Sequence, residues 1–278
     1  MARLSALVRD YDVILCDVWG VIRDGRALID GALDALTRFR ASGGSVILLS
    51  NSPQRSDWLL SHLAQLGAGN GRWDGAVTSG DAIFEELSRR APGPAYKLGP
   101  DYDDGLYEGT GLAFAPLEDA AFISCTGLVD FETETPEQYR DLLSEAALRR
   151  LPLVCANPDI VVQVGGALRY CAGALAQLYE ALGGTVVMAG KPHPPIYELA
   201  YRRLEALGVD ADRSRILAIG DGPKTDIAGA QGEGIDALFI TGGITGERLA
   251  GPFDAHAATG LLAEDALSAR YAAPALIW

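Results

Sequence analysis

The stretch that most restricts the fold is the apolar run Val13–Cys16, which ends abruptly in the carboxylate of Asp17. Short runs of β-branched and aliphatic residues predict a strand that is buried on both faces. A carboxylate without a partner is costly inside such a strand, so Asp17 should stand where the strand ends and a cleft begins. Open α/β sheets bind ligands outside the carboxyl ends of their strands, which makes Asp17 the first candidate functional residue.

Apolar runs and amphipathic helical patterns alternate along the rest of the chain. This alternation predicts parallel strands joined by right-handed crossovers, in an α/β fold with a Rossmann-like, doubly wound parallel sheet as its core. The pattern changes at 99–111, which is rich in Gly, Tyr and Asp, and a smaller strand-and-helix pattern follows before the first one resumes. We therefore predict a core formed by residues 1–99 and 185–278, with residues 100–184 as an inserted, smaller α/β cap domain.

The composition is that of a globular protein, with 49% hydrophobic and 22% charged residues among 278. A net charge of −14 argues against a nucleic acid or an anionic membrane as the main partner. No run approaches membrane-spanning length, and the first ten residues lack an apolar signal region. The four cysteines form no Cys-x-x-Cys pair, so we expect free thiols in a reducing compartment and a cytoplasmic protein.

Four of the predicted core strands end in polar residues, namely Asp17, Ser50, Lys191 and Asp221. At one edge of a parallel sheet they would combine a nucleophilic carboxylate, a hydroxyl, a cation and a second carboxylate. Attack by an anion on a phosphate ester needs compensating positive charge. Lys191 offers a compact point charge, and the two carboxylates offer the hard oxygen ligands that Mg²⁺ prefers. The constellation therefore favours Mg²⁺-dependent chemistry on a phosphate ester.

These segments together resemble the four motifs of the haloacid dehalogenase (HAD) superfamily. The motifs are, in order, Asp-Val-Trp-Gly-Val-Ile at 17–22, the apolar run into Ser50-Asn51, Gly-Lys-Pro at 190–192, and Gly-Asp-Gly-Pro-Lys-Thr-Asp at 220–226. The insert between the second and third motifs carries Asn157-Pro158-Asp159. It resembles the class IIA cap of the p-nitrophenyl phosphatase and pyridoxal phosphatase-like branch, although the same triplet also fits an ordinary turn.

The resemblance implies a role for each matching residue. Asp17 would be the nucleophile that forms an aspartyl-phosphate, Ser50 and Asn51 would bind the phosphoryl group, and Lys191 would hold both Asp17 and the phosphate. Asp17, the backbone carbonyl of Trp19 and Asp221, directly or through water, would bind Mg²⁺, and Asp226 would support the metal or Lys191. The cap residues facing the substrate would be Asn157, Asp159 and the turn at 170–173 with Gly173. The family further implies a small phosphorylated metabolite as substrate, and its capped members often form homodimers through the cap.

The chain departs from the family pattern at Trp19, where superfamily phosphatases carry a second Asp that acts as general acid and base. An indole N–H does not exchange protons at neutral pH, and losing such a group typically costs about 10²–10⁴ in rate. Three outcomes stay open: substrates with good leaving groups, another acid such as His193, or lost turnover. Members of the dehalogenase branch carry an aromatic Tyr here but need no metal and lack the 220–226 pattern. We expect a phosphohydrolase; the alternative is a turnover-impaired protein that binds a phosphorylated ligand.

Overall fold

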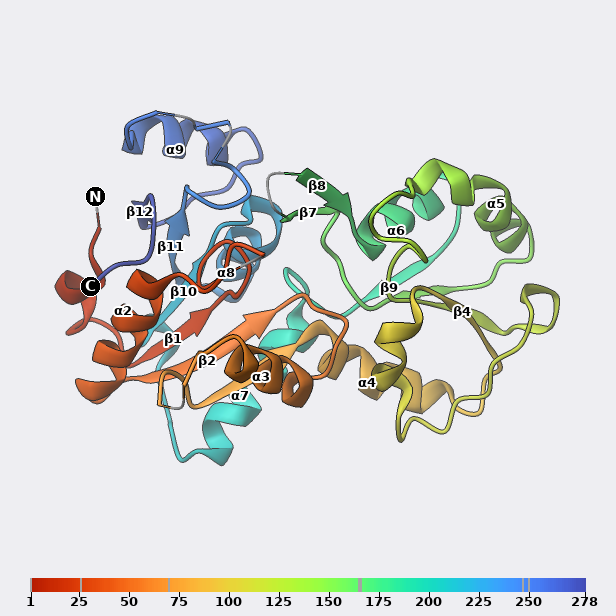
Figure 1. Cartoon of the computed structure of the whole chain (residues 1–278), viewed down its shortest axis with the longest axis horizontal. Coiled ribbons are helices and arrows are strands. Elements are labelled where there is room, and N and C mark those ends of the chain that lie inside the picture. Colours follow the sequence, from red (N-terminus) through yellow and green to blue (C-terminus); the bar gives the residue numbers. More distant parts are fainter. Residues whose placement is uncertain (1, 26, 70, 165–166, 247, 250) are drawn as a thin grey trace.

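The computed structural model describes residues 2–25, 27–69, 71–164, 167–246, 248–249 and 251–278, and two parallel sheets organise it (Figure 1). The larger sheet has six strands in the order β12-β11-β10-β1-β2-β3. Their bounds are β1 Val13–Cys16, β2 Ser45–Ser50, β3 Gly75–Thr78, β10 Ile216–Gly220, β11 Asp236–Ile240 and β12 Tyr271–Ala273. The central strand β1 pairs in parallel with β10 on one side and with β2 on the other. This arrangement confirms the predicted α/β class.

Helices cover both faces of the six-stranded sheet because its strands are apolar on both faces. Ile14 and Cys16 of β1 belong to one apolar cluster, and the alternating residues Val13 and Leu15 belong to another. The first cluster includes residues of α1 (Leu4–Leu7), α2 (Asp30–Ala41) and α3 (Ser56–Gln65). The second includes residues of α4 (Ser79–Arg90), α7 (Pro194–Ala206), α8 (Ala228–Glu233) and α9 (Ala255–Ala263). Alternation along a strand thus produces the doubly wound arrangement.

The smaller sheet has four parallel strands in the order β4-β5-β6-β9. They are β4 Ala95–Leu98, β5 Phe122–Cys125, β6 Leu153–Cys155 and β9 Val186–Met188. One face carries Ile123 and Leu153 and packs against α5 (Arg140–Leu148) and α6 (Ala172–Ala181). The opposite face carries Phe122 and Val154, which share a cluster with Leu87 of α4. Helix α4 therefore lies between the two sheets (Figure 1). One continuous apolar seam of buried side chains joins them.

Two strands belong to a different sheet from the one that the sequence predicts. We expected the runs at 95–98 and 185–189 to extend the core sheet, but β4 pairs with β5 and β9 pairs with β6. The prediction is wrong because an apolar run indicates a strand without indicating its partner, and both runs adjoin core segments in sequence. As a result, Lys191 enters the site from the end of a cap-sheet strand and not from the six-stranded sheet.

Further elements escaped the sequence analysis. An antiparallel hairpin joins β7 (Val161–Val164) to β8 (Ala167–Tyr170), and only its first strand was predicted. Helix α9 and strand β12 were also missed, and a 3₁₀ turn at Pro136–Tyr139 leads directly into α5. The other 3₁₀ segments are Asp101–Tyr107, Leu117–Asp119 and Arg213–Arg215. None of the helices in the described residues combines the length and the apolar character that a bilayer crossing would need.

Candidate active site

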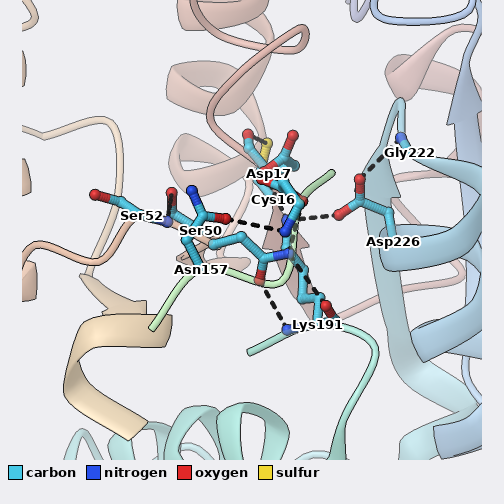
Figure 2. Close-up of polar contacts among 10 residues, drawn as sticks. Cys16, Asp17, Ser50, Ser52, Asn157, Lys191, Gly222 and Asp226 are labelled. Carbon is cyan, nitrogen blue, oxygen red and sulfur yellow. Dashed lines mark hydrogen bonds and ion pairs between the residues drawn. The ribbon is translucent and has the colours of Figure 1, made fainter. Parts of the chain in front are cut away.

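The ammonium group of Lys191 links two carboxylates at the edge of the six-stranded sheet. Lys191 Nζ lies 2.6 Å from Asp17 Oδ1, directly after β1, and 2.7 Å from Asp226 Oδ1 (Figure 2). All three side chains are buried, and Lys191 is only 3% exposed. Burial opposes the charge of Lys191, but the carboxylates of Asp17 and Asp226 outweigh it and hold its pKa well above the usual value. Lys191 therefore stays cationic and fixes the position of Asp17.

A single turn of π-helix, Pro223–Ile227, sets the position of Asp226. Its N–H groups bond five residues back instead of four, and such turns occur frequently at functional sites. The Asp226 Oδ2 atom accepts a hydrogen bond of 3.0 Å from Gly222 N, which leaves Oδ1 directed at Lys191 (Figure 2). The sequence indicated a helix here but not its irregular first turn.

Asp221 directly follows the neighbouring strand β10, and the backbone of Gly20 and Gly243 lies against its carboxylate. Its Oδ2 atom accepts a hydrogen bond of 2.6 Å from Ile244 N. A Cβ atom on Gly20, whose φ is +76°, or on Gly243 would lie only 1.9 Å from that oxygen. Glycine is needed at Gly20 because of both the left-handed backbone and the close approach.

The acidic side chains form a cluster whose chemistry fits a divalent cation. Ligand oxygens of Asp17, Asp221 and Asp226 all lie within 4.8 Å of one another. Burial first, and the charge of Asp226 second, raise the pKa of Asp17 well above its usual range and that of Asp221 to about 7. In the described part of the chain, Oδ2 of Asp17 and Oδ1 of Asp221 accept no hydrogen bond. These two oxygens, on buried side chains beside a third carboxylate, match the oxygen ligands that Mg²⁺ takes.

The amide of Asn51 ties the core strand β2 to Lys191 and to the cap. Asn51 Oδ1 accepts a hydrogen bond of 2.8 Å from Lys191 N, and its Nδ2 donates to Lys191 O at 3.1 Å and to Asp159 Oδ1 at 2.8 Å. Asn157 Oδ1 in turn accepts from Asp159 N at 3.0 Å, in an Asx turn that orients Asp159. Ser50, the last residue of β2, accepts from Ser52 N through its Oγ atom at 3.2 Å. The residues that sequence reasoning selected at 50–51 and 157–159 thus meet at one place.

These side chains line one cavity of about 760 Å³ between the two sheets. Trp19 also lines this cavity, and the guanidinium of Arg23 lies over its ring, with Cζ 4.5 Å from the ring centroid. The indole itself has no group that exchanges a proton at neutral pH. Six aspartates but two cations, Arg23 and Lys191, are found among the cavity-lining residues that the structure describes.

Two residues selected from the sequence do not line this cavity. Gly173 lies behind it, at the start of α6, where its N donates to Asp159 O and a Cβ would lie 2.2 Å from Pro158 O. Its position lets α6 approach the 158–159 backbone closely and does not support direct contact with a substrate. His193 caps the start of α7, where burial lowers its pKa, and it is not among the cavity-lining residues. The suggestion that His193 supplies the missing acid is therefore not supported.

Comparison with known proteins gives the same picture of the chain. A family model described as haloacid dehalogenase-like hydrolase matches residues 14–113, and a HAD-hydrolase-like model matches residues 188–266. A crystal structure of a haloacid dehalogenase-like hydrolase from Brucella suis 1330 is 40% identical, superposes with a TM-score of 0.90, and covers 100% of both chains. The chain belongs to the haloacid dehalogenase-like family of hydrolases.

More distant relatives of this HAD chain have named activities. An acid sugar phosphatase from Staphylococcus saprophyticus is 27% identical over 241 residues, which are 86% of this chain and 89% of the relative. The D-glycerol 3-phosphate phosphatase of Mycobacterium tuberculosis is 26% identical over 247 residues; the match takes in 87% of this chain but 66% of that enzyme. A glycerol phosphate phosphatase from the same organism, solved in complex with calcium, has a TM-score of 0.64 at 26% identity, with 86% and 68% of the two chains covered.

Several residues of the HAD site were missed by sequence reasoning. Arg23, Asp24 and Asp103 are the charged ones among them, and Arg23 and Asp103 are buried. Gln54 was also missed, and its Nε2 donates to Asp103 Oδ1 at 2.6 Å and to Tyr102 O at 2.8 Å. A polar residue shortly after a strand-end motif was the available signal for Arg23 and Gln54. Asp103 lies in the irregular 101–107 segment, where no periodicity distinguishes a buried side chain from an exposed one.

Asp103 should make the stability of the protein depend on pH. Burial raises the pKa of this carboxyl to about 6. The pKa of Asp103 is higher in the folded protein than in the unfolded chain. The stability that the protonated carboxyl contributes is therefore fully present below about pH 4 and is lost as the pH rises through 6. The difference amounts to about 3 kcal/mol. The free energy of unfolding of the wild type should therefore fall between pH 4 and 7. We expect it to fall less in Asp103→Asn, as measured by urea denaturation at each pH. The exposed Asp119→Asn should keep the wild-type slope, and an unchanged slope in Asp103→Asn would contradict the assignment.

Proposed function

We propose that the protein is a Mg²⁺-dependent phosphohydrolase that acts on a small phosphorylated metabolite through an aspartyl-phosphate. The observation that carries the proposal is the position of Asp17, held by Lys191 at 2.6 Å beside two further buried carboxylates in a large cavity. The relatives named acid sugar phosphatase and D-glycerol 3-phosphate phosphatase support a phosphate ester as the substrate.

In this proposal an oxygen of Asp17 attacks the phosphorus, a bond forms between them, and the ester P–O bond breaks. Lys191 keeps Asp17 in place and neutralises a phosphoryl oxygen, while Ser50 and Asn51 bind the others. Water then attacks the phosphorus, which releases inorganic phosphate and restores the Asp17 carboxylate. The departing alkoxide must gain a proton and the attacking water must lose one, and Trp19 can do neither. Substrates with weakly basic leaving groups are therefore favoured.

The metal site in this proposal uses Asp17, Asp221 and the backbone carbonyl of Trp19, and a bound Mg²⁺ would supply the positive charge that offsets the anionic phosphate. For Asp226 the family resemblance left two roles, supporting the metal or supporting Lys191. Since its two oxygens accept from Lys191 and Gly222, we assign it chiefly to holding Lys191. For the domains, sheet membership leads us to propose a cap from β4 to β9, residues 95–188, in place of 100–184.

Gly243→Ala should weaken Mg²⁺ binding, because its Cβ would lie 1.9 Å from Asp221 Oδ2 and displace that carboxylate. Changing a group that positions a metal ligand typically costs about 10- to 100-fold in metal affinity. The melting temperature of the protein is measured over a series of Mg²⁺ concentrations. We expect the concentration that gives half of the maximal increase to rise by that factor in Gly243→Ala. Gly260→Ala in α9, where no atom lies within 4 Å of the added Cβ, is the matched control. If Gly243→Ala folds and responds to Mg²⁺ like the wild type, Asp221 does not belong to the ion site.

A second candidate follows from Trp19 itself. The indole packs on Arg23 instead of offering an acid, which favours a protein that binds a phosphorylated ligand without efficient hydrolysis. A steady-state assay of phosphate release across a panel of phosphomonoesters, with Mg²⁺ or with a chelator, separates the two candidates. Turnover that needs Mg²⁺ supports the phosphohydrolase. Binding by calorimetry without turnover on any ester, p-nitrophenyl phosphate included, would favour the second candidate.

A further inference from the structure

The guanidinium of Arg23 is a buried cation in the candidate active site. The residue is 8% exposed, yet it lines the cavity that contains Asp17 and Lys191. Its Nη2 donates to Gly25 O at 3.0 Å, and its buried Nε has no hydrogen-bond partner in the described part of the chain. Nearly all buried polar groups in folded proteins are hydrogen-bonded, so an orphaned arginine nitrogen in a cavity indicates a missing partner.

Trp19 and the local backbone hold this guanidinium in a fixed orientation. The Arg23 Cζ atom lies 4.5 Å from the Trp19 ring centroid, and the edge of the same ring approaches Gly25, where a Cβ would be only 2.8 Å away. The Arg23 carbonyl accepts a hydrogen bond of 2.8 Å from Gly20 N, which ties the arginine to the turn after Asp17. Stacking on an aromatic face occupies one face of the guanidinium and leaves its N–H edge available.

The charge balance of the cavity indicates what this edge would bind. Lys191 already contacts Asp17 and Asp226 and serves the reacting phosphate in the proposed function. Arg23 is the other cation among the described cavity-lining residues. Asp24 is the acidic residue whose charge favours the protonated form of Arg23, but burial outweighs this and lowers the pKa of Arg23. The planar fork of arginine matches the oxygens of a carboxylate or a phosphate in two parallel hydrogen bonds.

We propose that Arg23 binds a second oxyanion, a carboxylate or a phosphate, on the part of the substrate that leaves with the ester oxygen. The inference rests on the proposed function, because it takes Asp17 and Lys191 as the place of the reacting phosphate. A cavity of about 760 Å³ has room for a ligand that extends well beyond one phosphoryl group. The substrate class is therefore a phosphorylated organic acid or a bisphosphate, and not a neutral phosphorylated alcohol or sugar.

Two matched pairs of ligands test this inference by binding, in the Asp17→Asn background and with Mg²⁺ present. The first pair is 3-phosphoglycerate and glycerol 3-phosphate, which differ by a carboxylate; the second is fructose 1,6-bisphosphate and fructose 6-phosphate. Calorimetry should show the more acidic member of at least one pair binding ten times or more tighter. The pair that shows the preference distinguishes a carboxylate from a phosphate. No preference in either pair would overturn the inference.

Variants of Arg23 then ask whether the preference depends on the guanidinium. Arg23→Met should abolish the preference for the more acidic ligand. Arg23→Lys keeps the charge but not the planar fork of donors, and it should lose most of the preference. This second variant also serves if Arg23→Met does not fold. Arg270→Met is the control, because Arg270 also lies over an aromatic ring, at 5.7 Å from that of Tyr271, but outside the cavity. A preference that survives in both Arg23 variants, or an equal loss of affinity for both members of a pair, would overturn the inference.

Turnover of the same four esters by the wild type separates this inference from the proposed function. Preference in binding without phosphate release would support the role of Arg23 and contradict phosphohydrolase activity. Phosphate release from both members of each pair with equal kcat/KM, and equal binding, would support the activity and contradict the role of Arg23.

Discussion

Asp17→Asn is expected to lower kcat for every phosphomonoester by on the order of 10⁴-fold or more, since removing a covalent nucleophile has effects of this size or larger. The amide keeps the shape of the side chain but has no anionic oxygen to attack phosphorus. It also carries no charge to pair with Lys191, which lies 2.6 Å from Asp17 Oδ1 in the wild type. The measurement is the rate of phosphate release at saturating substrate and Mg²⁺.

The control for this variant is Asp34→Asn, on the exposed surface of α2. Asp34 pairs with Arg38 one turn away, and both side chains are more than half exposed, so the pair contributes little. Its kcat should stay at the wild-type value. Thermal melting of Asp17→Asn checks that the fold is kept. A folded Asp17→Asn protein with wild-type turnover would show that Asp17 is not the nucleophile.

Trp19→Asp is the second variant with a large expected effect, a gain in kcat of about 10²–10⁴-fold on esters with poor leaving groups. The new carboxyl would stand two residues after Asp17 and would protonate the departing alkoxide, which the indole cannot do. The gain should be much smaller with p-nitrophenyl phosphate, because p-nitrophenolate leaves without needing a proton. The comparison of glycerol 3-phosphate with p-nitrophenyl phosphate therefore measures proton transfer specifically.

Trp19→Asn controls for the space that the indole vacates. It has nearly the same volume as the Asp variant and equally removes the contact with Arg23, but it has no carboxyl to exchange a proton. We expect no gain in kcat from Trp19→Asn. Equal gains in both variants would mean that space and not acid chemistry limits the wild type. No gain in a folded Trp19→Asp protein would mean that Trp19 is not the only obstacle to turnover.

Much of the site could be predicted from the sequence because of a local rule. Asp17 follows an apolar run, Ser50 ends one and Asp221 follows another, and parallel strands β1, β2 and β10 are direct neighbours, so their ends meet at one edge. The resemblance alone implied that Asn157 and Asp159 face the site, because nothing local places a cap loop against a core strand. The hydrogen bond from Asn51 to Asp159 was not predicted.

The rest depends on packing between segments that are distant in sequence. The run at 95–98 reads as a strand in isolation, but its pairing with β5 follows from burying Phe122 against α4, which no local pattern records. The sequence gives no sign that Arg23 is buried, because arginine side chains are mostly exposed. Its burial requires the ring of Trp19 beneath it, and that ring is visible in the sequence only as an irregularity in a motif.

The apolar seam around α4 has a consequence for engineering. Phe122 and Val154 of the cap share one apolar cluster with Leu87 of the core. Excising residues 95–188 would therefore expose apolar surface on both the core and the cap. A chimaera that combines this core with the cap of another protein would therefore also need the α4 side chains that pack against that cap. A graft with mismatched α4 residues is expected to aggregate.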